Sequence, residues 1–420
     1  MAKSAFRAAV RSTAVFVLTL TFATSCSSSS GQPVAPISGG VTPATATPSA
    51  APTTTPTATP KPTATPTVSP SPTPSSSMCP TAPAAASTPN AEEIYVSNND
   101  SITSYPVSPV GLRNEAPIAS IVGSAKINGA TALSGLKGIA LDVDGNIYVS
   151  SLTASAIAVY SPNPIGTLNE APIAAIAGPS TGLGNNWGVA LDANNEVNVV
   201  NRPFGGNGPN VELFDSGSSG NTGPLAGIAG NMTGLSNPDG LAIDAIGLYY
   251  VSNDSGLATA SITVYPGGLQ DNQLTNELPL ATIAGSLTNL QVPTGIAVDA
   301  TGKVYVADAN GFVDVYAAVP LSTTNQMLDE KPLAIITGSK TGLSDPVGIA
   351  LDSSGDIYVA NNTGCSGSSI TVYAANPSGT LNEAPLGTIA GGNTGLSGAE
   401  GIAIFTPPSL DPRRGFARRP

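Results

Sequence analysis

The stretch Gly348-Ile349-Ala350-Leu351-Asp352 decides the fold of this 420-residue chain, because the chain repeats it with small changes. The five other copies begin at Gly138, Gly188, Gly240, Gly295 and Gly401, at intervals of 50 to 55 residues. Self-similarity at a period of this size is typical of a repeat architecture, in which each repeat is one supersecondary unit. The sequence therefore predicts a ring or stack of six similar units.

Each unit contains four short apolar runs, which are clearest in the fifth copy at residues 348–351, 357–360, 370–373 and 386–390. Clusters of Gly, Asn, Asp and Pro separate the runs, and no run has helical periodicity. Between the first two runs, residues 352–356 have the Asp and Gly content of a hairpin turn. Four strands joined in this way form an antiparallel meander, which is the blade of a propeller.

The two ends of the repeat region complete one blade between them. The region begins with a second strand, at residues 94–98, and ends with an unpartnered first strand, at residues 401–405. Pairing them closes the ring and removes free sheet edges, which would otherwise template aggregation. We therefore predict an all-β fold: a six-bladed β-propeller of four-stranded antiparallel blades, with one blade closed by the N- and C-terminal strands.

The order of the repeated residues resembles a known family. Pro-x-Gly-Ile-Ala-x-Asp precedes Gly-x-Ile-Tyr-Val-Ala-Asp/Asn and then an Ile-x-Val-Tyr strand. This order is similar to the NHL repeat, and the resemblance covers residues 92–405. It implies a six-bladed propeller but no single function, since NHL propellers include lyases, RNA binders, receptor sensor domains and scaffolds.

The first residues have the pattern of an export signal. A basic start precedes an apolar stretch at residues 14–23, which is too short to span a membrane as a helix. The small residues that end at Cys26 resemble a bacterial lipobox, which implies cleavage before Cys26 and lipidation of its thiol. Ordinary secretion with an unmodified Cys26 is the alternative. We expect an export signal peptide at residues 1–25 and an extracytoplasmic protein, anchored to a bacterial membrane or held at the cell surface.

Residues 26–90 consist almost wholly of Ser, Thr, Pro and Ala, with Lys61 as the only charge. Such a composition cannot bury enough apolar surface to fold, and its prolines favour extended polyproline II. We expect a disordered, lipid-anchored stalk that holds a propeller at residues 91–406 away from a membrane. The arginine-rich residues 407–420 are expected to form a basic disordered tail.

Charge is unevenly distributed along the chain. Residues 91–405 contain 26 of the 27 acidic residues but only 7 of the 15 basic ones. So acidic a surface repels phosphate backbones, which disfavours nucleic-acid binding. The expected partners are the membrane, through the lipid anchor, and a peptide, glycan or protein ligand of a monomeric propeller.

Two cysteines remain if Cys26 carries lipid. Cys79 and Cys365 would then be left in an oxidising compartment, where disulfides form. A Cys79–Cys365 disulfide would join the stalk to the propeller, and two free thiols are the alternative.

The chain contains no histidine. This excludes Ser-His-Asp and Cys-His catalysis and any His-ligated zinc or iron site. The histidine-dependent lyases of the NHL family are therefore poor models, and we assign no catalytic residues.

The residue before each repeated glycine varies where the surrounding frame does not. These positions hold Lys137, Trp187, Asp239, Thr294, Val347 and Glu400. Propeller geometry places them near the mouth of the central channel. There two acids, one base and the only tryptophan would form a recognition ring, although the alternative is a set of unconstrained loop residues.

A second set of positions, at the ends of the second strands, is rich in oxygen ligands. It comprises Asn98, Ser151, Asn201, Asn253, Asp308 and Asn361. Oxygen-rich rings suit calcium, and calcium is the only cofactor that the sequence suggests. The NHL pattern itself carries Asp or Asn at this point, however, where the residue caps a loop. An Asn-Glu-Ala-Pro phrase before the fourth strands is interpreted as loop and strand-entry structure.

Three functions are compatible with these features. The favoured one is a surface-displayed binding or scaffold module that meets a peptide, glycan or protein at its channel mouth. The others are a metal-dependent lactonase-like or lyase-like enzyme and a structural envelope protein without a specific ligand. The lack of histidine and of a strong acid–base pair favours the first over the second, and no sequence feature separates the first from the third.

Overall fold

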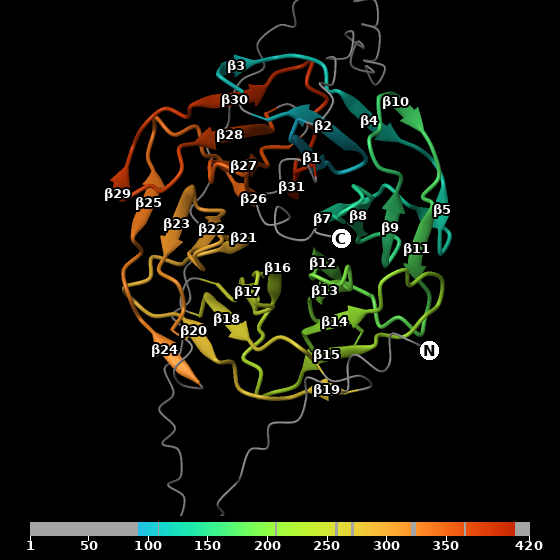
Figure 1. Ribbon diagram of the computed structural model, residues 1–420, viewed down its shortest axis with the longest axis horizontal. Coiled ribbons are helices and arrows are strands. Elements are labelled where there is room, and N and C mark those ends of the chain that lie inside the picture. Colours follow the sequence, from blue (N-terminus) through green and yellow to red (C-terminus); the bar gives the residue numbers. More distant parts are fainter. Residues whose placement is uncertain are drawn as a thin grey trace, which may run out of the picture. The chain divides into compact units, whose positions relative to one another are not determined.

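The computed structural model describes residues 91–407, apart from residues 108, 206–207, 257–258, 270–272, 321–324 and 365–366. Its secondary structure in this part of the chain consists of strands, and six sheets stand around a central axis (Figure 1). The predicted all-β, six-bladed propeller is confirmed.

Each blade has four antiparallel strands, counted from the axis outward. The first strands are β31 (Ile402–Phe405), β7 (Leu136–Leu141), β12 (Asn186–Leu191), β16 (Pro238–Ile243), β21 (Pro293–Val298) and β26 (Pro346–Leu351), in blades 1 to 6. The second strands, in the same order, are β1 (Glu93–Ser97), β8 (Ile147–Ser151), β13 (Val197–Asn201), β17 (Tyr249–Asn253), β22 (Val304–Asp308) and β27 (Ile357–Asn361). The third strands are β2 (Ile102–Pro106), β9 (Ala156–Tyr160), β14 (Asn210–Phe214), β18 (Ser261–Tyr265), β23 (Phe312–Tyr316) and β28 (Ser369–Tyr373). The fourth strands are β4 (Ala119–Val122), β11 (Ala174–Ala177), β15 (Ala226–Ala229), β20 (Ala281–Ile283), β25 (Ala334–Thr337) and β30 (Gly387–Ala390).

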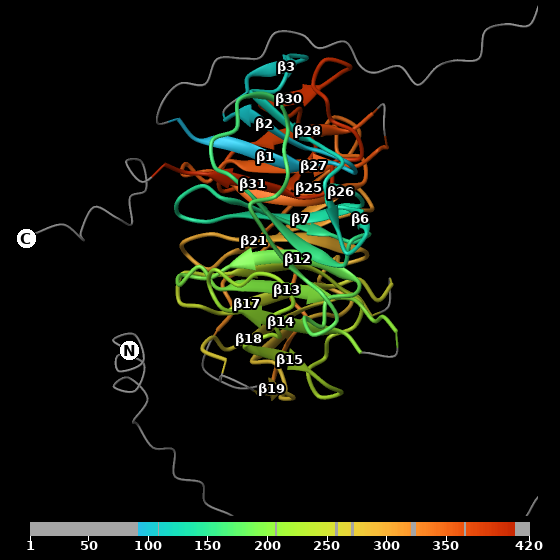
Figure 2. The same cartoon turned by 90° about the vertical axis from the view of Figure 1, so that its right-hand side faces the viewer.

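Blade 1 is assembled from the two ends of the repeat region. Strand β31 pairs antiparallel with β1, in a register that runs from Glu93 opposite Phe405 to Val96 opposite Ile402. The two strands lie side by side in Figure 2. The last repeated glycine phrase therefore supplies the innermost strand of the blade that the N-terminal strands begin.

The repeated glycines allow the first strands to approach one another closely. A Cβ atom placed on Gly188 would lie 2.7 Å from the carbonyl oxygen of Asp239 in the next blade. The equivalent glycine of every blade lies similarly close to the next blade. In blade 1, for example, a Cβ on Gly401 would lie 2.7 Å from the carbonyl oxygen of Lys137. A side chain at these positions would push neighbouring blades apart, which explains why the phrase begins with glycine.

Five sheets also contain a fifth, outermost strand that the sequence analysis did not anticipate. These strands are β3 (Gly111–Arg113), β10 (Gly166–Asn169), β19 (Leu274–Thr275), β24 (Gln326–Leu328) and β29 (Gly379–Leu381). Each leaves the connection between the third and fourth strands of its own blade and pairs in parallel with the fourth strand of the preceding blade. Because β3 pairs with β30, the ring is also closed at its outer edge, between blades 1 and 6.

The Asn of the Asn-Glu-Ala-Pro phrase connects neighbouring blades. Asn382 Oδ1 accepts a hydrogen bond of 2.9 Å from the backbone N–H of Lys340 in the preceding blade. Its side chain covers Gly338, where φ is +109° and an added Cβ would lie 2.5 Å from Asn382 Cγ. Equivalent bonds are made by Asn114, Asn221, Asn276 and Asp329.

The hydrophobic core is divided among the spaces between blades. One cluster, for example, combines Ile94 and Val96 of blade 1 with Tyr358 and Ile370 of blade 6. Blade 1 also carries a small hairpin, β5 (Lys126–Ile127) and β6 (Ala130–Thr131), in the connection from β4 to β7. The blades therefore hold one another in place, and the channel mouth is built on a rigid frame.

Candidate functional site

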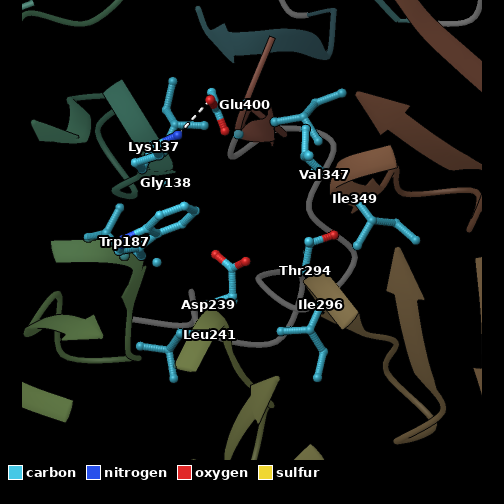
Figure 3. A pocket seen from close by; sticks show the side chains of 18 residues that line it. Lys137, Gly138, Trp187, Asp239, Leu241, Thr294, Ile296, Val347, Ile349 and Glu400 are labelled. Carbon is cyan, nitrogen blue, oxygen red and sulfur yellow. Dashed lines mark hydrogen bonds and ion pairs between the residues drawn. The ribbon is translucent and has the colours of Figure 1, made fainter. Parts of the chain in front are cut away.

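The six variable residues before the repeated glycines lie around one cavity of about 120 Å³ at the axis (Figure 3). The glycines themselves and one aliphatic residue from each blade complete its lining: Ile139, Val189, Leu241, Ile296, Ile349 and Ile402. The structure thus brings together Lys137, Trp187, Asp239, Thr294, Val347 and Glu400, which the sequence analysis had proposed as one ring.

A local irregularity of the first strands directs these side chains. In blades 2 to 6 the register between the first and second strands shifts at this point, for example between Asn186 and Val189 around Trp187. Such a β-bulge bends the strand and changes the direction of a side chain. The residue before the glycine can therefore face the axis while its neighbours remain in the blade.

Ion pairs join the ring across blade boundaries. Lys137 Nζ lies 2.6 Å from Glu400 Oε1, which also accepts a hydrogen bond of 3.2 Å from Asn362 Nδ2. A second ion pair involves Arg202, whose Nη2 donates to Asp239 Oδ2 at 2.7 Å and lies 3.8 Å from Asp254 Oδ2. The two basic groups of the mouth are both engaged.

Trp187 is the centre of this arrangement. Arg202 Cζ lies 3.4 Å from the centroid of its ring, and Lys137 Nζ lies 4.5 Å from it. The indole Nε1–H donates to Asn185 Oδ1 at 3.2 Å. Cations over a tryptophan ring are attracted by its quadrupole, so both contacts restrain the half-buried indole.

Arg202 is the residue that the sequence analysis missed. It follows the end of strand β13 and lies outside the position that varies before each glycine. A signal did exist, because Arg202 is the only basic residue in the six loops that follow the second strands. An alignment of these six loops, repeat against repeat, would have identified Arg202.

Burial shifts the mouth carboxyl groups towards the neutral form. It raises the pKa of Asp239 to about 6, and Arg202 opposes this effect while Asp254 adds to it. Burial likewise raises the pKa of Glu400, against the attraction of Lys137. Among the described residues, the mouth network contains four carboxyl groups, those of Asp239, Asp254, Asp345 and Glu400, and two basic groups, those of Lys137 and Arg202.

The other two ring positions, Thr294 and Val347, carry no charge. Thr294 Oγ1 lies 2.9 and 3.0 Å from the carbonyl oxygens of Ala307 and Pro346, to which it donates. Val347 adds an apolar side chain to the lining. Among the six ring positions, the charged side chains are therefore Glu400, Lys137 and Asp239, of blades 1, 2 and 4.

The second set of predicted residues lies within the blades. Asn253 Nδ2 donates to Thr263 Oγ1 at 3.1 Å, and its Oδ1 accepts the backbone N–H of Ser236 at 2.9 Å. Asn98 and Asn361 make the same two bonds, whereas Asp308 accepts three backbone N–H groups and Ser151 donates to Ser134. These side chains cap the loops that lead into the first strands. Within the described part of the chain, no group of three or more His, Cys, Asp or Glu residues could hold a metal ion.

Several predictions fall outside the described residues. They concern the export signal, lipidation of Cys26, the stalk, the Cys79–Cys365 disulfide and the basic tail. In the part that is described, no helix is long and apolar enough to cross a membrane.

No protein-family model and no curated protein matches the chain. Solved structures do resemble it. A protein of unknown function from Bacteroides caccae matches with a TM-score of 0.46 and 10% identity, over 75% of this chain and 99% of that one. The WD40 propeller domain of Doa1 matches with a TM-score of 0.40 and 12% identity, over 68% and 76% of the two chains. A putative gluconolactonase matches with a TM-score of 0.34 and 11% identity, over 58% and 74%. The six-bladed fold rests on the strand pairing itself.

Proposed function

We propose that this propeller is a binding module that receives a basic side chain of a peptide or protein partner at its channel mouth. The observation that carries the proposal is the excess of carboxyl groups around one cavity. Asp239 and Glu400 line the cavity together with the basic residue Lys137, and Asp254, Asp345 and Arg202 lie in the surrounding network. Burial raises the pKa of Asp239 and of Glu400, because desolvation outweighs the attraction of Arg202 and Lys137. An added cation would lower the energy of both carboxylates.

The size of the cavity supports a side chain rather than a whole small molecule. Small-molecule pockets usually measure ~300–1,000 Å³, whereas this cavity measures about 120 Å³. The charged end of a lysine or arginine could lie among Asp239 and Glu400, which line the cavity, while its methylene stem extends outward to the partner. Binding is favoured over catalysis because Asp239 and Glu400 are each held by a base, at 2.7 and 2.6 Å.

We further propose that the propeller is displayed outside the cytoplasm by lipid on Cys26, and that its repeats belong with the NHL type. The lipobox-like residues before Cys26 and the order of the repeated residues support these two proposals. The acid excess of residues 91–405 supports a partner other than nucleic acid.

Tryptophan fluorescence tests the proposed function directly, because Trp187 is the only tryptophan. The protein is titrated with the tripeptides Gly-Lys-Gly, Gly-Arg-Gly and Gly-Glu-Gly. We expect the two basic peptides to change Trp187 emission, less strongly at high salt, and Glu400→Gln to weaken the response. Asp144→Asn is the matched control, since it removes one acidic charge at an exposed turn. Equal responses to all three peptides, or equal effects of the two variants, would reject the proposal.

A further inference from the structure

A second cavity, of about 290 Å³, lies at the same end of blade 3 as Trp187. Its lining comes mainly from residues 182–185, which lead into β12, and from residues 201–205, at the end of β13 and in the loop after it. These two segments meet because Asn186 at the start of β12 pairs with Asn201 at the end of β13. The second cavity is therefore built where blade 3 approaches the channel mouth.

Trp187 and two of its contacts separate the second cavity from the axial one. Trp187 lines the axial cavity, whereas Asn185 and Arg202 line the second. Asn185 Oδ1 accepts the indole Nε1–H at 3.2 Å, and Arg202 Cζ lies 3.4 Å from the centroid of the ring. The two cavities are therefore neighbours, and a partner with one side chain at the axis has the second cavity within reach.

Phe204 gives the second cavity an aromatic surface. It lines the cavity and is 60% exposed. A Cβ on Gly184 would lie 2.7 Å from Phe204 Cδ1, so the ring lies against a residue without a side chain. Gly182, Gly205 and Gly208 also belong to the lining. An exposed ring in such a glycine-rich wall leaves room for a second flat ring to pack on it.

The repeat frame does not account for Phe204. The loop after β13 is longer than the five other loops that follow second strands, and Phe204 is the only aromatic residue in any of them. Apolar residues scattered singly over a surface are common. Phe204 differs from these because it lines a cavity beside the mouth, which indicates a role in binding.

We propose that the second cavity binds an aromatic side chain of the same peptide partner whose basic side chain enters the axial cavity; this inference rests on the proposed function. In an extended peptide, side chains two positions apart point to the same side and are about 7 Å apart. The aromatic residue therefore stands two positions from the basic one. Aromatic rings in contact gain attraction beyond their buried area, so Phe204 determines specificity for an aromatic side chain.

Capped pentapeptides test the proposal on the full-length protein. The parent peptide is Gly-Lys-Gly-Gly-Gly, and the two aromatic peptides are Gly-Lys-Gly-Phe-Gly and Gly-Phe-Gly-Lys-Gly, because the direction of the bound chain is open. The same two peptides with Leu in place of Phe test whether the ring is needed. Binding is measured by calorimetry and by Trp187 emission. We expect one aromatic peptide to bind at least tenfold more tightly than the parent and more tightly than its leucine counterpart.

Variants of Phe204 assign the gain to the second cavity. Phe204→Ala should reduce the gain to less than twofold and leave the affinity for the parent peptide unchanged. Phe204→Tyr keeps the ring and should keep the gain. Ile246→Ala is the control, since it removes another exposed apolar side chain, 70% exposed in a turn of blade 4, and should change neither affinity.

The outcomes distinguish this proposal from the proposed function. Glu400→Gln should weaken the binding of every lysine peptide, whereas Phe204→Ala should weaken only that of the aromatic one. If the parent binds and neither aromatic peptide binds more tightly, the aromatic site is overturned while the axial site stands. A gain that survives Phe204→Ala, or an equal gain with leucine, also overturns it. If no peptide binds, both proposals fail.

Discussion

The hydroxyl of Tyr105 donates a hydrogen bond of 2.7 Å to the carbonyl oxygen of Thr394, although 289 positions separate the two residues. Tyr265, Tyr316 and Tyr373 make the same bond to a threonine of the preceding blade: Thr233, Thr288 and Thr341. Blades 6 and 1 are therefore joined by the contact that joins blades adjacent in sequence. This hydrogen bond is therefore kept where the last blade meets the first.

The first prediction concerns closure. A chain that ends at Ala399 lacks β31 and leaves the paired edge of β1 and the buried Ile94 and Val96 without cover. We expect it to lose several kcal/mol of a typical ~5–15 kcal/mol stability, measured by urea unfolding. A chain that ends at Pro407 is the control and should unfold like the intact protein. Equal midpoints for the two truncations would contradict this closure scheme.

The second prediction concerns the asparagine that connects blades. Asn382→Ala removes the bond to the Lys340 N–H, so it should destabilise the protein by about 1 kcal/mol. Glu383→Ala alters the exposed neighbour and should change the free energy of unfolding by less than ~0.5 kcal/mol. If thermal denaturation ranks the two variants in the opposite order, the asparagine does not stabilise the contact between blades.

The repeat phrase predicted the fold because its physical cause is local. Glycine is needed where first strands meet, and the Asp-rich turn and the apolar runs are each readable within one repeat. The fifth strands were missed because a run as short as β19 pairs with a different repeat, so no signal within its own blade reveals the partner. Similarly, the residues before the glycines were found as one column, whereas Arg202 reaches the mouth from a loop of irregular length.

The third prediction uses Tyr160, whose buried hydroxyl has no hydrogen-bond partner. The equivalent tyrosines, such as Tyr265, donate to the carbonyl oxygen of a threonine in the preceding blade. Blade 1, which precedes Tyr160, has the β5–β6 hairpin at that place. Tyr160→Phe should therefore be neutral or stabilising, since it removes a buried unsatisfied group. Tyr265→Phe should instead cost about 1 kcal/mol, because Thr233 loses its donor. Chemical denaturation of both variants checks the difference, and an equal loss in each would show that Tyr160 has a partner.

The last prediction concerns pH. Asp314 occupies a position that is threonine in three sister blades, and it is fully buried opposite Val306. Asn289 Nδ2 donates to its Oδ1 at 2.8 Å, its Oδ2 has no partner, and the nearby Asp308 repels its charge. Burial raises the pKa of Asp314 from 3.8 to about 7, and burial also raises the pKa of Glu212 from 4.5 to about 7.

The direction of the pH effect follows from proton binding. Between pH 4 and 7 the folded protein holds protons on these two carboxyl groups that the unfolded chain has released, so stability falls as the pH rises through this window. Each group should account for a loss on the order of 2–4 kcal/mol by pH 8. Asp314→Thr, the sister residue, should flatten the profile and raise stability at pH 8, with little change at pH 4. Asp215→Asn, at an exposed position, should leave the slope unchanged. Urea unfolding at a series of pH values measures these slopes, and a wild-type stability that rises from pH 4 to 8, or an Asp314→Thr slope equal to that of the wild type, would refute the assignment.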